Sequence, residues 1–76
     1  MYDIKKELRD KARLVRGLAN ALGYDAEYVL IDVENFDLVC LSESMRETSD
    51  TIQKLADNLK EMEYLVHLIK RGETRQ

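Results

Sequence analysis

The chain of 76 residues has no proline and no tryptophan, and only three glycines, one phenylalanine, one histidine and one cysteine. A single cysteine excludes an intramolecular disulfide framework, and we expect Cys40, in its apolar run, to be a buried free thiol in a reducing compartment. Metal sites usually need three or four ligands, and His67 stands alone. We therefore expect no metal, no cofactor and no enzymatic activity, because no nucleophile, base and orienting group come together.

Long apolar segments are also missing. No run of about 18 apolar residues is present for a membrane span, and the first residues lack the apolar segment of a signal peptide. We expect a cytoplasmic protein without membrane contact. A chain this short forms one domain, residues 1–76, whose lone core is marginal, so a homo-oligomer (dimer or higher) is expected.

The net charge of −3 is distributed unevenly along the chain. Residues 1–22 carry six Lys and Arg against three acids, giving +3. Residues 23–50 carry one base against eight acids, giving −7, and residues 51–76 carry five bases against four acids, giving +1. Such asymmetry bears on the electrostatic choice of a partner more than on the fold.

The first predicted helix covers residues 2–22. Apolar residues follow a spacing of three and four, with Lys11 in the one polar position: Ile4, Leu8, Val15, Leu18 and Leu22. Asp3 is the expected N-cap, and Gly23 the expected residue just past the C-terminus. The opposite face carries a basic stripe, which consists of Lys5, Arg9, Arg13 and Arg16.

A second helix is predicted over residues 44–71. Ser44 and Glu47 have the spacing of a capping box, and Gly72 is expected to end the helix, followed by a frayed tail at 73–76. Its apolar seam again alternates spacings of three and four and consists of Met45, Thr48, Ile52, Leu55, Leu59, Met62, Val66 and Ile69. Two such seams favour packing as an antiparallel coiled-coil-like pair.

Between these helices, residues 27–42 contain two apolar runs around Glu34 and Asn35. With these two as loop residues, alternation places Val29, Ile31 and Val33 on one face opposite Cys40, Leu38 and Phe36, which predicts a β-hairpin. The predicted fold is therefore α+β: helix, β-hairpin, helix. The alternative is an all-α helical bundle, also oligomeric, because no glycine or proline interrupts residues 25–70 and Glu-Asn is a weak turn signal.

Three resemblances bear on these expectations. The helix–hairpin–helix outline resembles prefoldin subunits, in which hairpins assemble the oligomer. Residues 36–42 resemble the strand-to-helix passage of cobalamin-binding domains, but without the Asp-x-His-x-x-Gly motif. Residues 18–29 resemble the helix-turn-helix of phage-repressor-like regulators. That likeness implies DNA binding, yet the segment that would read DNA carries four acids, which repel phosphate: Asp25, Glu27, Asp32 and Glu34.

These observations predict a small non-enzymatic protein–protein interaction module that acts as a homo-oligomer: an adaptor, a scaffold or a small inhibitor of the kind phages encode. The alternative is a nucleic-acid-binding transcriptional regulator that uses the basic stripe. The basic stripe is the predicted partner-binding site. The predicted oligomer interface consists of Val29, Ile31, Val33, Phe36, Leu38, Ile52, Leu55, Leu59 and Met62.

Overall fold

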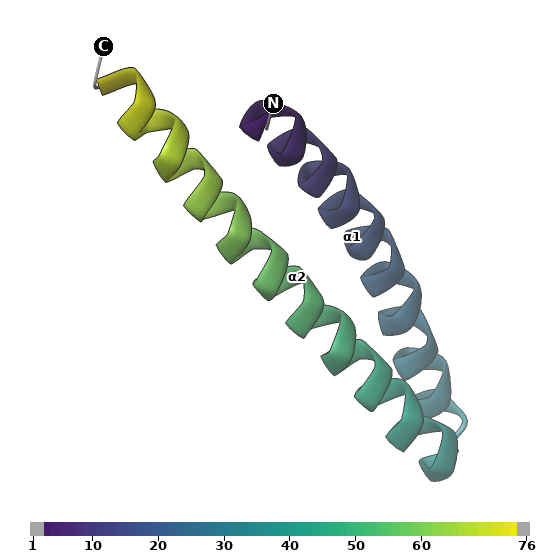
Figure 1. Cartoon of the computed structure of the whole chain (residues 1–76). Coiled ribbons are helices and arrows are strands. Elements are labelled where there is room, and N and C mark those ends of the chain that lie inside the picture. Colours follow the sequence, from purple (N-terminus) through teal and green to yellow (C-terminus); the bar gives the residue numbers. More distant parts are fainter. Residues whose placement is uncertain (1–2, 75–76) are drawn as a thin grey trace.

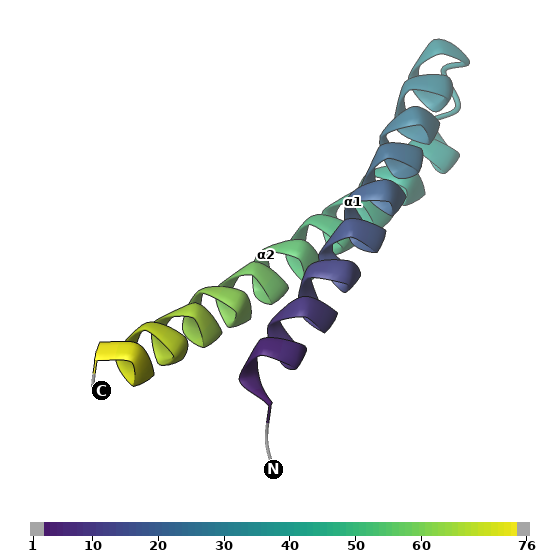
Figure 2. The same cartoon turned by 90° about the horizontal axis from the view of Figure 1, so that it is seen from above.

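The computed structural model describes residues 3–74, which form two helices, α1 (Ile4–Glu34) and α2 (Leu38–Thr74). The helices run antiparallel as a helical hairpin, so that the two ends of the chain lie at one end and the tip at the other (Figure 1). From the tip they run side by side and then diverge toward the termini (Figure 2). The chain is a rod, with extents of 60 × 17 × 14 Å.

The predicted α+β fold is wrong, because the described residues contain no strand. Residues 27–42, the expected β-hairpin, form the end of α1, the tip and the beginning of α2. The all-α alternative is confirmed as a two-helix hairpin. Of the prefoldin outline only the paired helices remain. The helix-turn-helix likeness does not hold because α1 passes unbroken through residues 18–29, and the cobalamin-domain likeness does not hold because α2 begins at Leu38 with no strand before it in the described residues.

The predicted helix ends are right in one place only. Asp3 caps α1, since its Oδ1 accepts a hydrogen bond from the Lys6 N–H at 3.1 Å. Gly23 and Gly72 end neither helix, and no described glycine has a positive φ. Ser44 lies inside α2 rather than at its N-terminus. The predicted start at residue 2 and the last two residues of the predicted tail lie outside the described residues.

Three residues, Asn35 to Asp37, make the tip. Phe36 has a φ of 53°, and the Phe36 and Asp37 N–H groups donate to the Val33 and Asp32 carbonyls at 3.1 and 3.0 Å. These two bonds define a Schellman motif, with phenylalanine where glycine is usual. Asp37 also caps α2, because its Oδ1 accepts from the Cys40 N–H at 3.1 Å. One residue therefore closes α1 and opens α2.

The face that each helix turns to the other follows an unbroken heptad repeat. Its residues are half-buried, apart from Leu65, which is buried at 4% exposure. On α1 this seam consists of Ile4, Leu8, Lys11, Val15, Leu18, Leu22, Asp25, Val29 and Asp32. On α2 it consists of Leu41, Ser44, Thr48, Thr51, Leu55, Asn58, Met62, Leu65 and Ile69. Seven of these eighteen positions are polar, so the seam is far less apolar than a coiled-coil core.

Polar pairs join the helices across this seam. The Thr51 hydroxyl donates to the Asp25 carboxylate at 2.8 Å, and the Ser44 hydroxyl donates to Asp32 at 2.5 Å. Toward the open end, the Lys11 ammonium pairs with Glu61. In both hydroxyl pairs the two residue numbers have the same sum, as an antiparallel pair in constant register requires. These bonds therefore fix how α2 is aligned on α1.

We predict that Thr51→Val lowers the free energy of unfolding by about 1–2 kcal/mol, because the half-buried Asp25 carboxylate loses its hydroxyl donor. Thr48→Val is the matched control, since the Thr48 hydroxyl donates only within its own helix, to the Ser44 carbonyl at 2.7 Å. Urea unfolding followed by circular dichroism measures both. Equal effects of the two variants would mean that the cross-helix bond contributes nothing.

Candidate functional site

The described surface is rich in exposed apolar side chains. Among the residues whose burial is described, fourteen large apolar residues are at least 37% exposed, whereas Leu65 alone is buried. A monomeric soluble protein scatters such residues singly, and contiguous patches mark interaction sites. The candidate functional site is therefore an exposed apolar surface, and it has two parts.

The first part is the apolar tip, five residues that surround the turn: Leu30, Val33, Phe36, Leu38 and Val39. Their exposed fractions run from 46% for Val33 to 84% for Phe36. The Schellman turn holds Phe36 in the left-handed region, which L-residues reach at a cost of about 1–2 kcal/mol. The most exposed aromatic ring in this surface thus sits on its most strained backbone.

Asp37 sets the electrostatics beside the apolar tip. Its pKa is lowered from the ordinary value of 3.8, first by the hydrogen bond from the Cys40 backbone N–H. The Asp37 carboxylate in turn raises the pKa of the Cys40 thiol, first through a hydrogen bond between the two side chains. The negative charges of Asp32 and Glu43 raise it further. Cys40 is exposed, contrary to the expected buried thiol. Its raised pKa disfavours the reactive thiolate at neutral pH.

The second part is the apolar side face, formed by one row of residues on each helix. The alanine row of α1 repeats every seven residues and consists of Ala12, Ala19, Ala26 and Val33. The large apolar row of α2 repeats at the same interval and consists of Leu38, Met45, Ile52, Leu59 and Val66. All nine residues are exposed. Each row follows the seam by one position in the heptad, and in an antiparallel pair such positions of both helices lie on one side.

The opposite side of the hairpin is more polar. A hollow there is lined by residues of both helices that precede the seam, among them Glu7, Glu61 and Leu68. The pKa of Lys11 in this hollow is raised, first by its hydrogen bond to Glu61. The hollow confirms that equivalent heptad positions of the two helices share a side. The apolar side face is thus separate from this hollow, whose lining combines charged side chains with Tyr64, Leu65 and Leu68.

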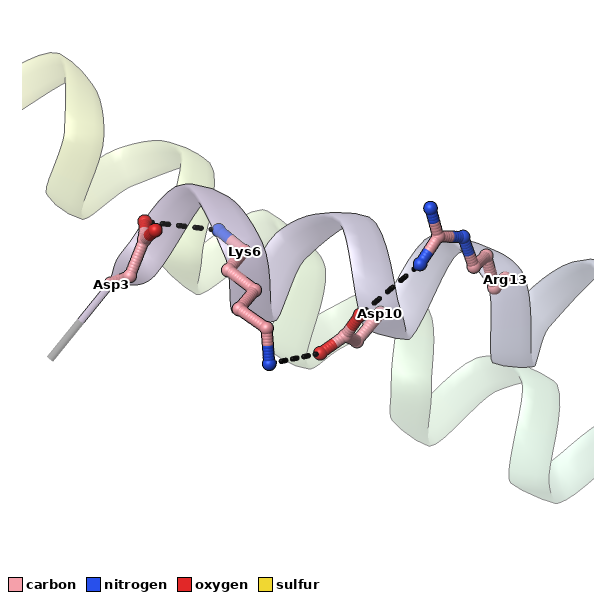
Figure 3. A network of polar contacts seen from close by, with 4 residues as sticks. All are labelled: Asp3, Lys6, Asp10 and Arg13. Atoms are coloured by element: carbon pink, nitrogen blue, oxygen red, sulfur yellow. Dashed lines mark hydrogen bonds and ion pairs between the residues drawn. The ribbon is translucent and has the colours of Figure 1, made fainter.

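The basic stripe is exposed on the outer part of α1. Figure 3 shows a polar network that includes one stripe residue, Arg13: Asp10 pairs with Lys6 at 3.6 Å and with Arg13 at 3.5 Å, and the Lys6 N–H donates to the Asp3 cap. Among the four predicted residues Lys5, Arg9, Arg13 and Arg16, only Arg13 has a carboxylate within ion-pair distance in the described part of the chain. Three cations therefore remain open to an external anion.

The predicted interface residues do not form one surface. Val29, Leu55 and Met62 are half-buried in the seam of the hairpin itself. Ile31 is 47% exposed, but its heptad position places it away from the apolar side face. The remaining predicted residues lie on the apolar side face or the apolar tip: Val33, Phe36, Leu38, Ile52 and Leu59. The alanine row was missed, although its seven-residue spacing is visible in the sequence.

The fold defines the class of this protein as an antiparallel helical hairpin. No family model matches the sequence, and comparison with curated proteins and with solved structures finds no significant match. Within residues 3–74, neither helix has a stretch apolar enough to cross a membrane. The same residues contain no group of three or more His, Cys, Asp or Glu side chains placed to hold a metal ion.

We predict a pH-dependent contribution of Asp37 to stability. Because its folded-state pKa is lowered, the contribution is present above the unfolded-state pKa and is lost as pH falls through the folded-state value. Asp37→Asn keeps a cap acceptor but does not titrate. The difference in melting temperature between the wild type and Asp37→Asn should therefore favour the wild type near neutral pH and shrink on acidification. A difference independent of pH would contradict the role of the Asp37 charge.

Proposed function

We propose that this protein is a non-enzymatic protein–protein interaction module that self-associates and binds another protein through its apolar tip. In this role it acts as an adaptor, a scaffold or a small inhibitor of the kind phages encode. The observation that carries the proposal is Phe36, which is 84% exposed at a φ of 53°.

Phe36 lowers the stability of the isolated chain, and no packing contact offsets that loss. Glycine at this position of a Schellman motif avoids the strain of a left-handed phenylalanine. The ring buries almost none of its surface against either helix, so packing does not offset that strain. Backbone strain at exposed positions concentrates where a ligand is bound. An aromatic ring held out on a rigid turn is also the type of side chain that dominates binding energy in protein interfaces.

The surroundings of Phe36 indicate the chemistry of the partner. Leu38 and Val39 are 70% and 75% exposed beside it, and Glu34 and Asp37 add negative charge to the same turn. The complementary surface is an apolar pocket with basic residues at its rim. A phosphate-bearing partner is disfavoured at this end of the hairpin, because residues 23–50 carry a charge of −7.

We predict that Phe36→Gly raises the free energy of unfolding by about 1 kcal/mol, since the left-handed conformation loses its strain. Urea unfolding measures this change. The same variant should weaken binding of the partner at least tenfold, roughly the effect of losing a central aromatic contact. A variant that is more stable and still binds fully would remove Phe36 from the proposal.

Photo-crosslinking identifies and tests the partner. A photoreactive phenylalanine analogue at position 36 should yield one discrete adduct with another polypeptide in native lysate. The control carries the analogue at Tyr64, which is 62% exposed on α2, far from the tip. Equal adducts at both positions, or none at position 36, would contradict binding through the apolar tip.

The second candidate function is nucleic-acid binding through the basic stripe, favoured by the three cations without an ion-pair partner. We predict that Arg9→Glu with Arg13→Glu weakens partner binding at low salt and leaves helicity intact. Lys54→Glu with Lys60→Glu on α2 is the control with the same change of charge. Unchanged affinity would exclude the basic stripe from partner contact. A DNA mobility shift that falls steeply with salt, and falls only with the α1 pair, would favour the regulator instead.

A further inference from the structure

The two rows of the apolar side face lie next to each other in matched layers. The bond between Asp25 and Thr51 sets the register of the hairpin. One position further along each helix, Ala26 therefore lies beside Ile52, and by the same register Ala19 lies beside Leu59. Each layer thus pairs a small residue of α1 with a large one of α2. This is a continuous apolar strip on which another helical pair can pack.

The hairpin exposes more surface than a compact chain of its size. Its accessible area is 6279 Å², whereas a compact monomer of 8.9 kDa is expected to expose about 4,800 Å². The excess is roughly 1,500 Å² per chain. A standard protein interface buries about 800 Å² per partner, and obligate homodimers bury more. The excess is thus as large as the area that each chain of a stable dimer covers.

Charge distinguishes between two ways of pairing two hairpins face to face. Residues 23–50, which include the tip, carry −7, while residues 1–22 and 51–76 at the other end carry +3 and +1. A parallel pair would place −7 beside −7. An antiparallel pair places the acidic tip of one copy beside the basic end of the other, which is favourable.

We propose that two copies of this chain pack their apolar side faces against each other, with tips at opposite ends, as an antiparallel four-helix bundle. The inference rests on the self-association part of the proposed function and names the occupant of that surface. Ile52, the middle residue of the large apolar row, lies at the two-fold axis and faces its own copy. Around it α2 packs on α2 and α1 on α1, so that alanine rows approach closely and large apolar rows interdigitate.

The arrangement also gives the basic stripe a role. With Ala26 and Ile52 at the centre, the tip of one copy ends near the level of Arg16 in the other. Arg16 flanks the apolar side face and has no carboxylate within ion-pair distance among residues 3–74. The acids Glu34 and Asp37 of the opposite tip supply the missing charge. Val33 and Leu38 belong to both the apolar tip and the apolar side face and are covered in this dimer. Phe36 and Val39 are not part of the apolar side face, so Phe36 stays available for binding another protein.

Double electron–electron resonance between nitroxide labels on Cys40, the one cysteine of the sequence, tests the proposal without any substitution. Cys40 is exposed and precedes the seam, so a nitroxide there points away from the apolar side face. It lies twelve residues from Ile52, and at 1.5 Å per residue the two labels of an antiparallel dimer are about 36 Å apart along the bundle. A parallel dimer would place the two labels level along the bundle, separated only across its width, which is roughly 20 Å for two packed helices plus the reach of the label arms. The short distance, or no dipolar modulation at micromolar concentrations, would overturn the proposal.

Substitutions then locate the contact. Ile52→Glu should raise the dissociation constant of the dimer by about 100-fold or more, because the charge is buried twice at the two-fold axis. Tyr64→Glu alters a side chain that is also exposed on α2 but lines the hollow on the opposite side, and it should leave the dissociation constant within about threefold. Sedimentation equilibrium measures both, and equal effects would overturn the assignment of the face. If the chain dimerises but no crosslink forms at position 36, only binding through the apolar tip is contradicted. If the crosslink forms but the chain does not dimerise, only the antiparallel dimer is contradicted.

Discussion

The alignment of two helices by polar pairs across their shared seam is the constraint on which the structure depends. Asp25 with Thr51 and Asp32 with Ser44 place charged and hydroxyl groups where a coiled coil would have leucine. Such pairs specify register, because any slip leaves a half-buried carboxylate without its donor. They contribute little apolar burial. The hairpin therefore has a well-defined alignment and a weak core.

The remaining apolar residues follow from that constraint. With seven polar positions in the seam, large side chains such as Ile52 and Leu59 fall one position beyond it and stay exposed. A two-helix rod with one buried side chain among its described residues lacks the interior that normally offsets chain entropy. We propose that contact through the surface that the hairpin presents outward supplies the missing interior. This explains why a short charged chain carries alanine and large apolar residues at a strict seven-residue interval on one side.

The sequence predicted the two helices, their antiparallel packing and the Asp3 cap, because these depend on apolar periodicity and local hydrogen bonding. The prediction for residues 27–42 was wrong because Asp25, just before this segment, and Asp32, within it, occupy seam positions, and polar residues there conceal the helical repeat. Their hydroxyl partners lie 26 and 12 residues away, so only the fold reveals the match. The turn at residues 35–37 was not predicted because Phe36 adopts a left-handed conformation that glycine usually supplies. The sequence placed Leu38, Ile52 and Leu59 of the large apolar row in the predicted interface. That this row lies beside the seam, and not in it, became visible only from the alignment of α2 on α1.

The central claim is that one hairpin buries too little to be stable and that its apolar side face completes the core by contact between chains. The dependence of thermal stability on protein concentration tests this claim most directly, because association stabilises the folded state by mass action. Circular dichroism melting over a roughly thousandfold concentration range should show a midpoint that rises steadily with concentration. A sharp transition whose midpoint is the same at every concentration would contradict the account.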